Sequence, residues 1–144
     1  MTRLLLVRHG QSTWNADGRW QGQADPPLSP LGETQASVAA GSLPALDAIF
    51  TSDLIRAVRT AEILGAGAGL TPQLEPRLRE RHAGEWTGLT RAEIEERWPG
   101  YLGDHRRPPG YEDDALLLAR ALEALDAVAD ALPAGTVGAI SHGG

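Results

Sequence analysis

The N-terminal stretch Leu4–Gly10, LLLVRHG, joins an unbroken apolar run to three residues of a different kind. Four consecutive apolar residues predict a short β-strand buried on both faces, as in a parallel sheet. Arg8 and His9 follow at the carboxyl end of this strand, and Gly10 permits a tight turn. Open α/β sheets bind ligands at the carboxyl ends of their strands. The stretch therefore predicts both a fold class and the place of a site.

Beyond this stretch, short apolar segments alternate with longer segments of helical periodicity. Further strands are predicted at residues 48–50, 70–74 and 136–140. Helices are predicted at residues 31–42, 53–64, 90–98 and 113–132. This alternation indicates an α/β fold, a three-layer sandwich with a mostly parallel central sheet flanked by helices. The length of 144 residues suits a single domain spanning residues 1–144.

Side chains that accept hydrogen bonds precede three of the predicted helices. Ser29 is expected to cap the first helix, in front of a proline that suits its first turn. Ser52 or Asp53 is expected to cap the second helix, and Asp113 or Asp114 is expected to start the last.

The composition excludes several classes of protein. Hydrophobic residues make up 42% of the chain and charged residues 22%, which are ordinary values for a globular protein. The chain has no cysteine, which excludes disulfides, a thiolate nucleophile and cysteine-ligated zinc. The apolar run at the start is too short for a signal peptide or a membrane span, so we expect a cytoplasmic protein without a membrane partner.

The charge of the chain limits its partners. The net charge is −6, and all 13 basic residues are arginines. An acidic chain is a poor binder of nucleic acid, so no nucleic-acid partner is expected. A local group of arginines can still bind an anion, because salt screens the distant charges over about 8 Å.

Three further residues follow the predicted strands or begin the helix after them. Arg56 lies in the first turns of the second long helix, where an anion is favoured. Glu80 follows a third apolar segment, and His142 follows the last strand. Because the carboxyl ends of parallel strands meet at one edge, we expect these residues to converge with Arg8 and His9. Two alternatives remain open: Glu80 as a surface ion-pair residue, and a metal site, which the neighbouring arginines disfavour.

These residues belong to a pattern that runs through the whole chain. Its segments are RHGQSTWN at 8–15, RWQG at 19–22, PLSPLG at 27–32, SDLIRA at 52–57, LRE at 78–80, GEWTG at 84–88 and SHGG at 141–144. In this pattern and its order the chain resembles the histidine phosphatase superfamily, specifically the phosphoglycerate-mutase-like branch with the RHG motif. The resemblance implies a phosphoglycerate-mutase-like fold.

The resemblance also implies a role for each matching residue. His9 would be the nucleophile, and Glu80 would be the acid that protonates the leaving oxygen. The phosphate would be surrounded by Arg8, Arg56 and His142. The substrate-binding residues would be Asn15, Gln21, Gly22 and Gly143. The resemblance implies no metal and no cofactor.

These roles agree with simple physical chemistry. A phosphate monoester carries about −1.5 to −2 charges at neutral pH, and arginine forks match its oxygens. His9 has to attack as a neutral imidazole, and one ring nitrogen attacks while the other binds a hydrogen-bond acceptor. We expect that acceptor to be a backbone carbonyl.

Within this family the chain is predicted to be a phosphatase that acts on a small phosphorylated metabolite. Mutases usually have a longer insertion between the glutamate and the second histidine, whereas Glu80 and His142 are only 62 positions apart. The RWQG segment at 19–22 also resembles phosphatases. Residues 78–90 resemble glucosyl-3-phosphoglycerate phosphatases in particular. A phosphoglycerate mutase is the alternative.

The chain departs from the family pattern in two places. Residues 109–113 replace a Gly-Gly-Glu-Ser run of many relatives, and the chain stops soon after His142. Relatives usually continue for another helix or more, so we expect the usual C-terminal segment to be lacking. A hypothesis of another class follows: an inactive phosphate-binding module, or a fragment completed by a partner or by a second copy in a homo-oligomer.

Overall fold

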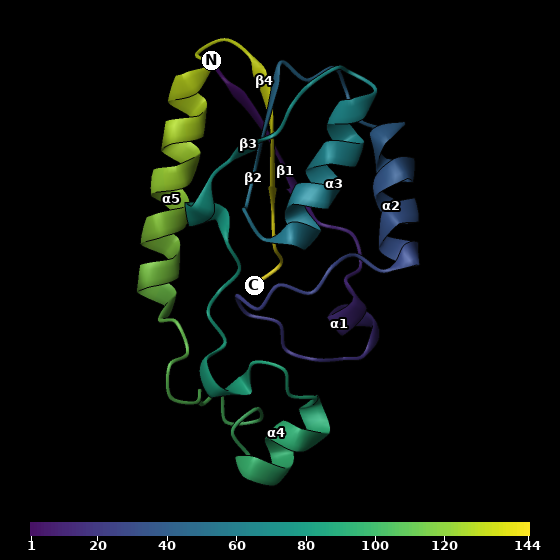
Figure 1. Cartoon of the computed structure of the whole chain (residues 1–144). Helices are drawn as coiled ribbons and strands as arrows, with labels where there is room; N and C mark the ends of the chain where they lie inside the picture. Colours follow the sequence, from purple (N-terminus) through teal and green to yellow (C-terminus); the bar gives the residue numbers. More distant parts are fainter.

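The computed structural model describes all 144 residues and has an α/β architecture (Figure 1). Four strands form one sheet in the order β1-β4-β2-β3, and every neighbouring pair is parallel. The strands are β1 (Arg3–Arg8), β2 (Ala48–Thr51), β3 (Gln73–Leu74) and β4 (Thr136–Ser141). The helices are α1 (Thr13–Ala16), α2 (Pro30–Ala40), α3 (Ile55–Ala66), α4 (Arg91–Arg97) and α5 (Asp114–Ala131). Two short 3₁₀ turns are η1 (Pro76–Leu78) and η2 (Gly84–Trp86).

Helices cover the sheet on both sides, which confirms the predicted three-layer sandwich. Figure 1 shows α2 and α3 on one side of the strands and α5 on the other. On the α3 side, Ile49 and Ile140 pack against Ala57 and Leu64. On the α5 side, Val128 packs against Val137. Strand β4 lies between β1 and β2, and its four central residues are buried.

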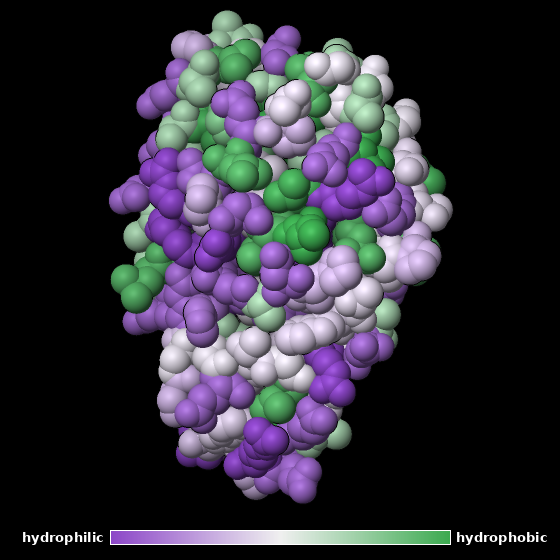
Figure 2. Space-filling model, viewed as in Figure 1, coloured by the Kyte–Doolittle hydropathy of each residue, from purple (hydrophilic) through white to green (hydrophobic).

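Strand β1 is not the doubly buried strand that its sequence predicts. It lies at the edge of the sheet, and the side chain of Leu6 is 66% exposed. On α5, Leu118 and Leu122 are also more than half exposed. Figure 2 shows apolar surface near the middle of one face of the molecule, among polar residues.

None of the helices has the length and apolar character needed to cross a membrane.

Two predicted element boundaries are wrong for identifiable reasons. The strand predicted at 70–74 shrinks to β3, because the amide of Leu70 bonds back to Gly65 at the end of α3. Helix α3 begins after Leu54, and neither Ser52 nor Asp53 is its N-cap residue. Instead, the carboxylate of Asp25 accepts the amide hydrogen of Ile55 at 2.7 Å. A distant loop therefore supplies the cap.

Other helix starts follow the sequence. Ser29 caps α2 by accepting the amide hydrogen of Gly32, and Asp113 caps α5 in the same way. Helix α1 and both 3₁₀ turns were not predicted. Ser12 and Asn15 form a reciprocal capping box around the single turn of α1. A helix this short has no periodicity for a sequence pattern to reveal.

The loop after β1 is pressed against the start of α2. A Cβ atom at Gly10 would overlap the carbonyl of Gly32, and a Cβ atom at Gly32 would overlap the carbonyl of Gln11. The amide of Gln11 also donates to the side chain of Gln35 in α2 at 2.8 Å. The loop that contains His9 therefore lies so close to α2 that neither Gly10 nor Gly32 has room for a side chain.

Substituting Gly32→Ala should therefore destabilise the fold by about 1–3 kcal/mol, because the new methyl group cannot avoid backbone atoms. The matched control is Gly67→Ala at the end of α3, where φ is −69° and no atom lies within 4 Å of the new Cβ. Its free energy of unfolding should stay within about 0.5 kcal/mol of the wild type. Denaturant unfolding measures both, and equal midpoints for the two variants would contradict the packing argument.

Candidate active site

The register of β1 and β4 places two histidines side by side. Arg8 pairs with Ser141 across the two strands, and the amide of His9 donates to the carbonyl of Ser141 at 3.1 Å. The rings of His9 and His142 therefore lie 4.9 Å apart, at an interplanar angle of 62°. The predicted convergence of strand ends is confirmed for this pair.

His9 is buried and has a defined tautomer. A carbonyl oxygen can only accept, so ring atom Nδ1 carries a hydrogen and donates to the carbonyl of Gly10 at 2.5 Å. Atom Nε2 is then left with a free lone pair. Burial, followed by the charges of Arg56 and Arg8, lowers the pKa of His9 to about 4, against the opposing effect of the Gly10 bond. The ring is neutral at pH 7, and the predicted carbonyl acceptor is confirmed.

Arg56 enters the site from the first turn of α3 and is fully buried. Its two terminal nitrogens donate to the carbonyls of Ala24 and Gly22, at 2.8 and 2.9 Å. No carboxylate lies within 4 Å of its guanidinium, and its Nε atom has no hydrogen-bond partner. Burial lowers the pKa of Arg56 from its ordinary value. Neutral carbonyl dipoles thus hold the guanidinium, and the carboxylates of Glu80 and Asp25 act on its charge only from beyond 4 Å.

His142 provides a second polar atom without a partner. Its Nε2 lies 2.9 Å from the hydroxyl of Ser52, and its Nδ1 is buried and unbonded. Burial, with the charge of Arg56 next, lowers the pKa of His142 to about 2. Buried polar atoms in folded proteins rarely lack partners. Nε of Arg56 and Nδ1 of His142 are thus two nitrogens available to an anion.

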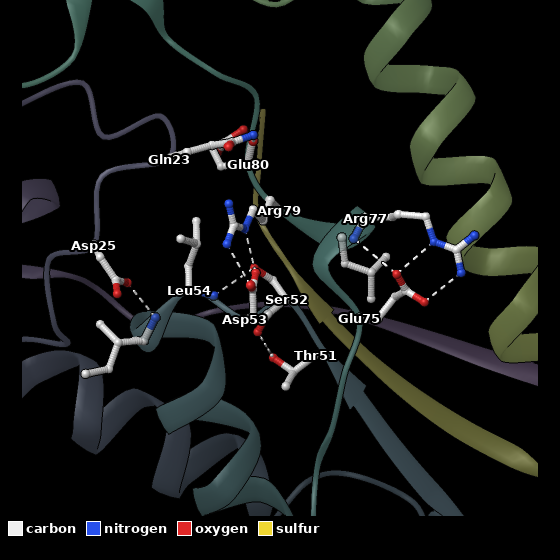
Figure 3. A network of polar contacts seen from close by, with 12 residues as sticks. Gln23, Asp25, Thr51, Ser52, Asp53, Leu54, Glu75, Arg77, Arg79 and Glu80 are labelled. Carbon is white, nitrogen blue, oxygen red and sulfur yellow. Dashed lines mark hydrogen bonds and ion pairs between the residues drawn. The ribbon is translucent and has the colours of Figure 1, made fainter.

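Glu80 lies in the loop between η1 and η2, and it is not the surface ion-pair residue of the alternative interpretation. Its Oε1 accepts the amide hydrogen of Arg81 at 2.7 Å, and its carboxylate makes no ion pair. The neighbouring Arg79 binds Asp53 through two bonds of 2.6 and 2.7 Å (Figure 3). The side chain of Gln23 donates to the Glu80 carbonyl at 3.2 Å.

The Glu80 loop is held by a residue that the sequence interpretation missed. From α5, Arg120 donates to the carbonyls of Arg77, Arg79 and Glu80 at 2.8 to 2.9 Å. Two further bonds of 2.7 and 2.8 Å join the same guanidinium to Glu112. The sequence contained one feature that could have identified Arg120: it is the only basic residue in a helix that carries four acidic residues.

The remaining predicted residues line a cleft of about 400 Å³, whose lining contains the sequence neighbours of the two histidines, Arg8 and Gly143, but neither histidine itself. Arg8 is exposed at its wall, has no ion pair, and packs against Gly143 through its guanidinium. The predicted residues in its lining are Arg8, Asn15, Gln21, Gly22, Glu80 and Gly143. The lining also contains Trp20, Arg81 and Tyr111. Of these, Arg81 and Tyr111 were missed; the Arg81 guanidinium lies 5.4 Å from the centre of the Tyr111 ring.

Gly22 has a structural reason to be glycine. Its φ is +50°, and a Cβ atom there would overlap the backbone of Ala83. Its carbonyl accepts from Arg56. Gln21, next to it, accepts a hydrogen bond from the hydroxyl of Ser12. The 21–22 turn therefore connects α1, Arg56 and the wall of the cleft.

A family model for the histidine phosphatase superfamily (branch 1) matches residues 4–144. The chain belongs to this superfamily. Its sequence is 49% identical to glucosyl-3-phosphoglycerate phosphatase of Mycobacterium tuberculosis over 102 residues, covering 68% of this chain and 45% of that protein. It is 43% identical to the probable phosphoglycerate mutase GpmB of Cronobacter sakazakii, over 99% of this chain and 70% of that protein. This histidine phosphatase chain thus spans about half the length of the first of these relatives.

Solved structures agree with this assignment. A mycobacterial glucosyl-3-phosphoglycerate phosphatase in complex with VO3 superposes with a TM-score of 0.92 at 36% identity, covering 98% of this chain and 75% of that one. YhfR of Bacillus stearothermophilus gives a TM-score of 0.91 at 36% identity, covering 99% and 75% of the two chains. The phosphoglycerate-mutase-like fold expected from the sequence is confirmed.

The two lowered histidine pKa values make the stability of this histidine phosphatase chain depend on pH. An unfolded histidine takes up a proton below about pH 6.5, whereas the folded rings resist it down to about 4 and 2. The unfolded state therefore binds more protons, and stability falls as the pH falls. Between pH 7 and pH 5 we expect a loss on the order of 2 kcal/mol for each ring.

Denaturant unfolding at pH 5, 6 and 7 measures this slope. His142→Gln should be less sensitive to pH than the wild type, by about the contribution of one ring. His82→Gln is the matched control, because the ring of His82 is exposed to solvent. If His142→Gln and the wild type lose equal stability between pH 7 and pH 5, the buried-neutral assignment is wrong.

Proposed function

We propose that this chain hydrolyses small phosphate monoesters through a phosphohistidine intermediate on His9. The observation that carries the proposal is the tautomer of His9, whose Nδ1 is bonded to a carbonyl and whose Nε2 is free. Two partnerless buried nitrogens, on Arg56 and His142, belong to the same site. A nucleophile beside anion-binding groups supports phosphoryl transfer better than any other chemistry.

In the first step, Nε2 of His9 attacks phosphorus and the bond from phosphorus to the ester oxygen breaks. The leaving oxygen takes a proton from the Glu80 carboxyl group, and the alcohol departs. In the second step, water attacks the phosphohistidine and gives its proton to the Glu80 carboxylate. The bond from phosphorus to Nε2 breaks, inorganic phosphate leaves, and both residues return to their starting state.

The arginines act by charge. Arg8 and Arg56 have no carboxylate within 4 Å, so both can bind the phosphate oxygens. Their donors also stabilise the charge on the equatorial oxygens during transfer. The donors of the protein suffice for this reaction, and the proposed mechanism needs no metal.

The substrate class follows from the cleft and from the relatives. A glucosyl-3-phosphoglycerate phosphatase is among the similar proteins, which supports a phosphorylated metabolite of the phosphoglycerate type. Arg81 lies directly after Glu80 and lines the same cleft, where the leaving group would sit. Its partner carboxylate, Asp114, is almost fully exposed to water, so solvent weakens that ion pair.

Phosphoglycerate mutase activity is the second candidate, favoured by the similarity to the probable mutase GpmB along nearly the whole chain. A mutase returns the phosphoryl group from histidine to the organic acid, whereas a phosphatase passes it to water. Incubation with 3-phosphoglycerate separates the two: we expect inorganic phosphate, and 2-phosphoglycerate would favour the mutase instead.

Phosphate release from an aryl phosphate between pH 5 and 8, without added metal, tests the proposal on the 144-residue chain. His9→Ala should lower kcat/KM on the order of a thousandfold or more, because the nucleophile is gone. Acid quenching of the wild type with labelled substrate should trap phosphate on histidine. Unchanged activity in His9→Ala would refute the nucleophile. A folded wild type that binds phosphate without turnover would favour the inactive phosphate-binding module.

Glu80→Gln tests the acid separately. An aryl oxide leaves without help, whereas an alkoxide needs a proton. The substitution should therefore slow an alkyl phosphate by about 10²–10⁴-fold and an aryl phosphate much less. Glu85→Gln is the matched control, since Glu85 is exposed and outside the cleft. Equal losses on both substrates would show that Glu80 is not the acid.

A further inference from the structure

The hydroxyl of Ser52 is the one protein group bonded to the ring of His142. Ser52 is fully buried in the segment between β2 and α3, and its amide donates to the carbonyl of Ile140 at 2.9 Å. Its Oγ lies 2.9 Å from Nε2 of His142 and accepts the amide hydrogen of Leu54 at 3.3 Å (Figure 3 shows the bond from Leu54). Either Oγ of Ser52 or Nε2 of His142 carries the hydrogen of this bond.

The hydrogen-bond donors and acceptors around Ser52 decide between these two arrangements. A serine hydroxyl has one hydrogen to donate, and Nε2 of His142 is its only acceptor in the structure. If Nε2 carried a hydrogen, it would donate to Oγ and the buried Ser52 hydrogen would have no acceptor. Nδ1 would then present a lone pair, which repels phosphate oxygens. If Nδ1 carries the hydrogen, Ser52 is satisfied and Nδ1–H is free to donate.

A doubly protonated ring fits the surroundings less well. Nε2–H would again leave the Ser52 hydrogen without an acceptor. The charged groups that act on the ring, Arg56, Arg120 and Arg8, are all cations and would repel an imidazolium, and the ring of His9 adds to this when protonated. The geometry therefore leaves one arrangement in which the buried Ser52 hydrogen has an acceptor and Nδ1–H of His142 has no partner within the chain.

We propose that Ser52 is a positioning residue that holds His142 in the neutral Nδ1–H form, so that Nδ1 donates to the phosphoryl group. Both rings of the site then carry their hydrogen on Nδ1, but a different ring nitrogen is free in each. In His9, Nδ1–H donates to the Gly10 carbonyl and Nε2 is free to attack. In His142, Nε2 accepts from Ser52 and Nδ1–H is free to donate. The phosphoryl ligand in this inference rests on the proposed function, whereas the tautomer does not.

The tautomer is measured directly on the free chain by long-range ¹H–¹⁵N correlation of the histidine rings at pH 7. His142→Gln identifies which of the four ring systems belongs to His142. We expect Nδ1 to carry the hydrogen and Nε2 to be bare. A hydrogen on Nε2, or an even mixture of tautomers, overturns the proposal. This readout needs neither substrate nor activity, so failure of the proposed phosphatase activity leaves it intact.

The variant Ser52→Ala tests whether the Ser52 hydroxyl is what fixes the tautomer of His142. In Ser52→Ala the His142 ring should lose its fixed tautomer, and the dissociation constant for inorganic phosphate should rise about 10- to 100-fold. Ser52→Thr keeps the hydroxyl and should restore both the spectrum and the affinity. An unchanged tautomer in folded Ser52→Ala overturns the assignment.

Thr51→Val is the matched control for a structural effect. Thr51 is as buried as Ser52, and its hydroxyl donates to the Ser52 carbonyl, not to the histidine. Its loss should leave the spectrum of His142 and the phosphate affinity near the wild type. If Thr51→Val weakens phosphate binding as much as Ser52→Ala, the hydroxyl of Ser52 acts only by packing and the proposal fails. Circular dichroism spectra of all three variants show whether each has folded.

Discussion

The parallel pairing of β1 with β4 is the constraint on which the rest of the site depends. Arg8 lies opposite Ser141, so His9 and His142 leave the sheet as neighbours. A register shift of one residue would turn alternate side chains to the other face of the sheet and would separate the two rings. The backbone ladder continues one residue beyond the strands, through the bond between His9 and Ser141. Main-chain hydrogen bonds thus set the distance between the two rings.

The arginines divide into two groups according to what neutralises them. Arg120 and Arg79 each bind a carboxylate through two bonds, so their charge is compensated and they fasten the Glu80 loop. Arg56 is held equally firmly, but by the carbonyls of Gly22 and Ala24. Carbonyl dipoles orient a guanidinium without cancelling its charge. The guanidinium of Arg56 is thus fixed in position without an ion pair, and its positive charge lies at the carboxyl edge of the sheet.

The sequence correctly predicted those elements and contacts that depend on short-range patterns and on the convergence of strand ends. The four longer helices α2 to α5, strand β4 and the meeting of His9 with His142 all follow from such patterns. The sequence failed where a distant partner decides the outcome. Asp25 caps α3 from another loop, and Arg120 reaches carbonyls some 40 positions away along the chain. The exposure of Leu6 likewise depends on β1 lying at the sheet edge, which no local pattern records.

The acidic net charge of −6 does not oppose an anion site, because three of the acids near it are paired with arginines. Asp53, Glu75 and Glu112 all bind arginines. Arg8 and Arg56, which make no ion pair, also help to lower the pKa of His9. A cation that attracts phosphate therefore keeps the nearby imidazole deprotonated, with its lone pair free. Under the proposed function, the arginines that bind the anion also add to the effect of burial, which is the main cause of the low pKa of His9.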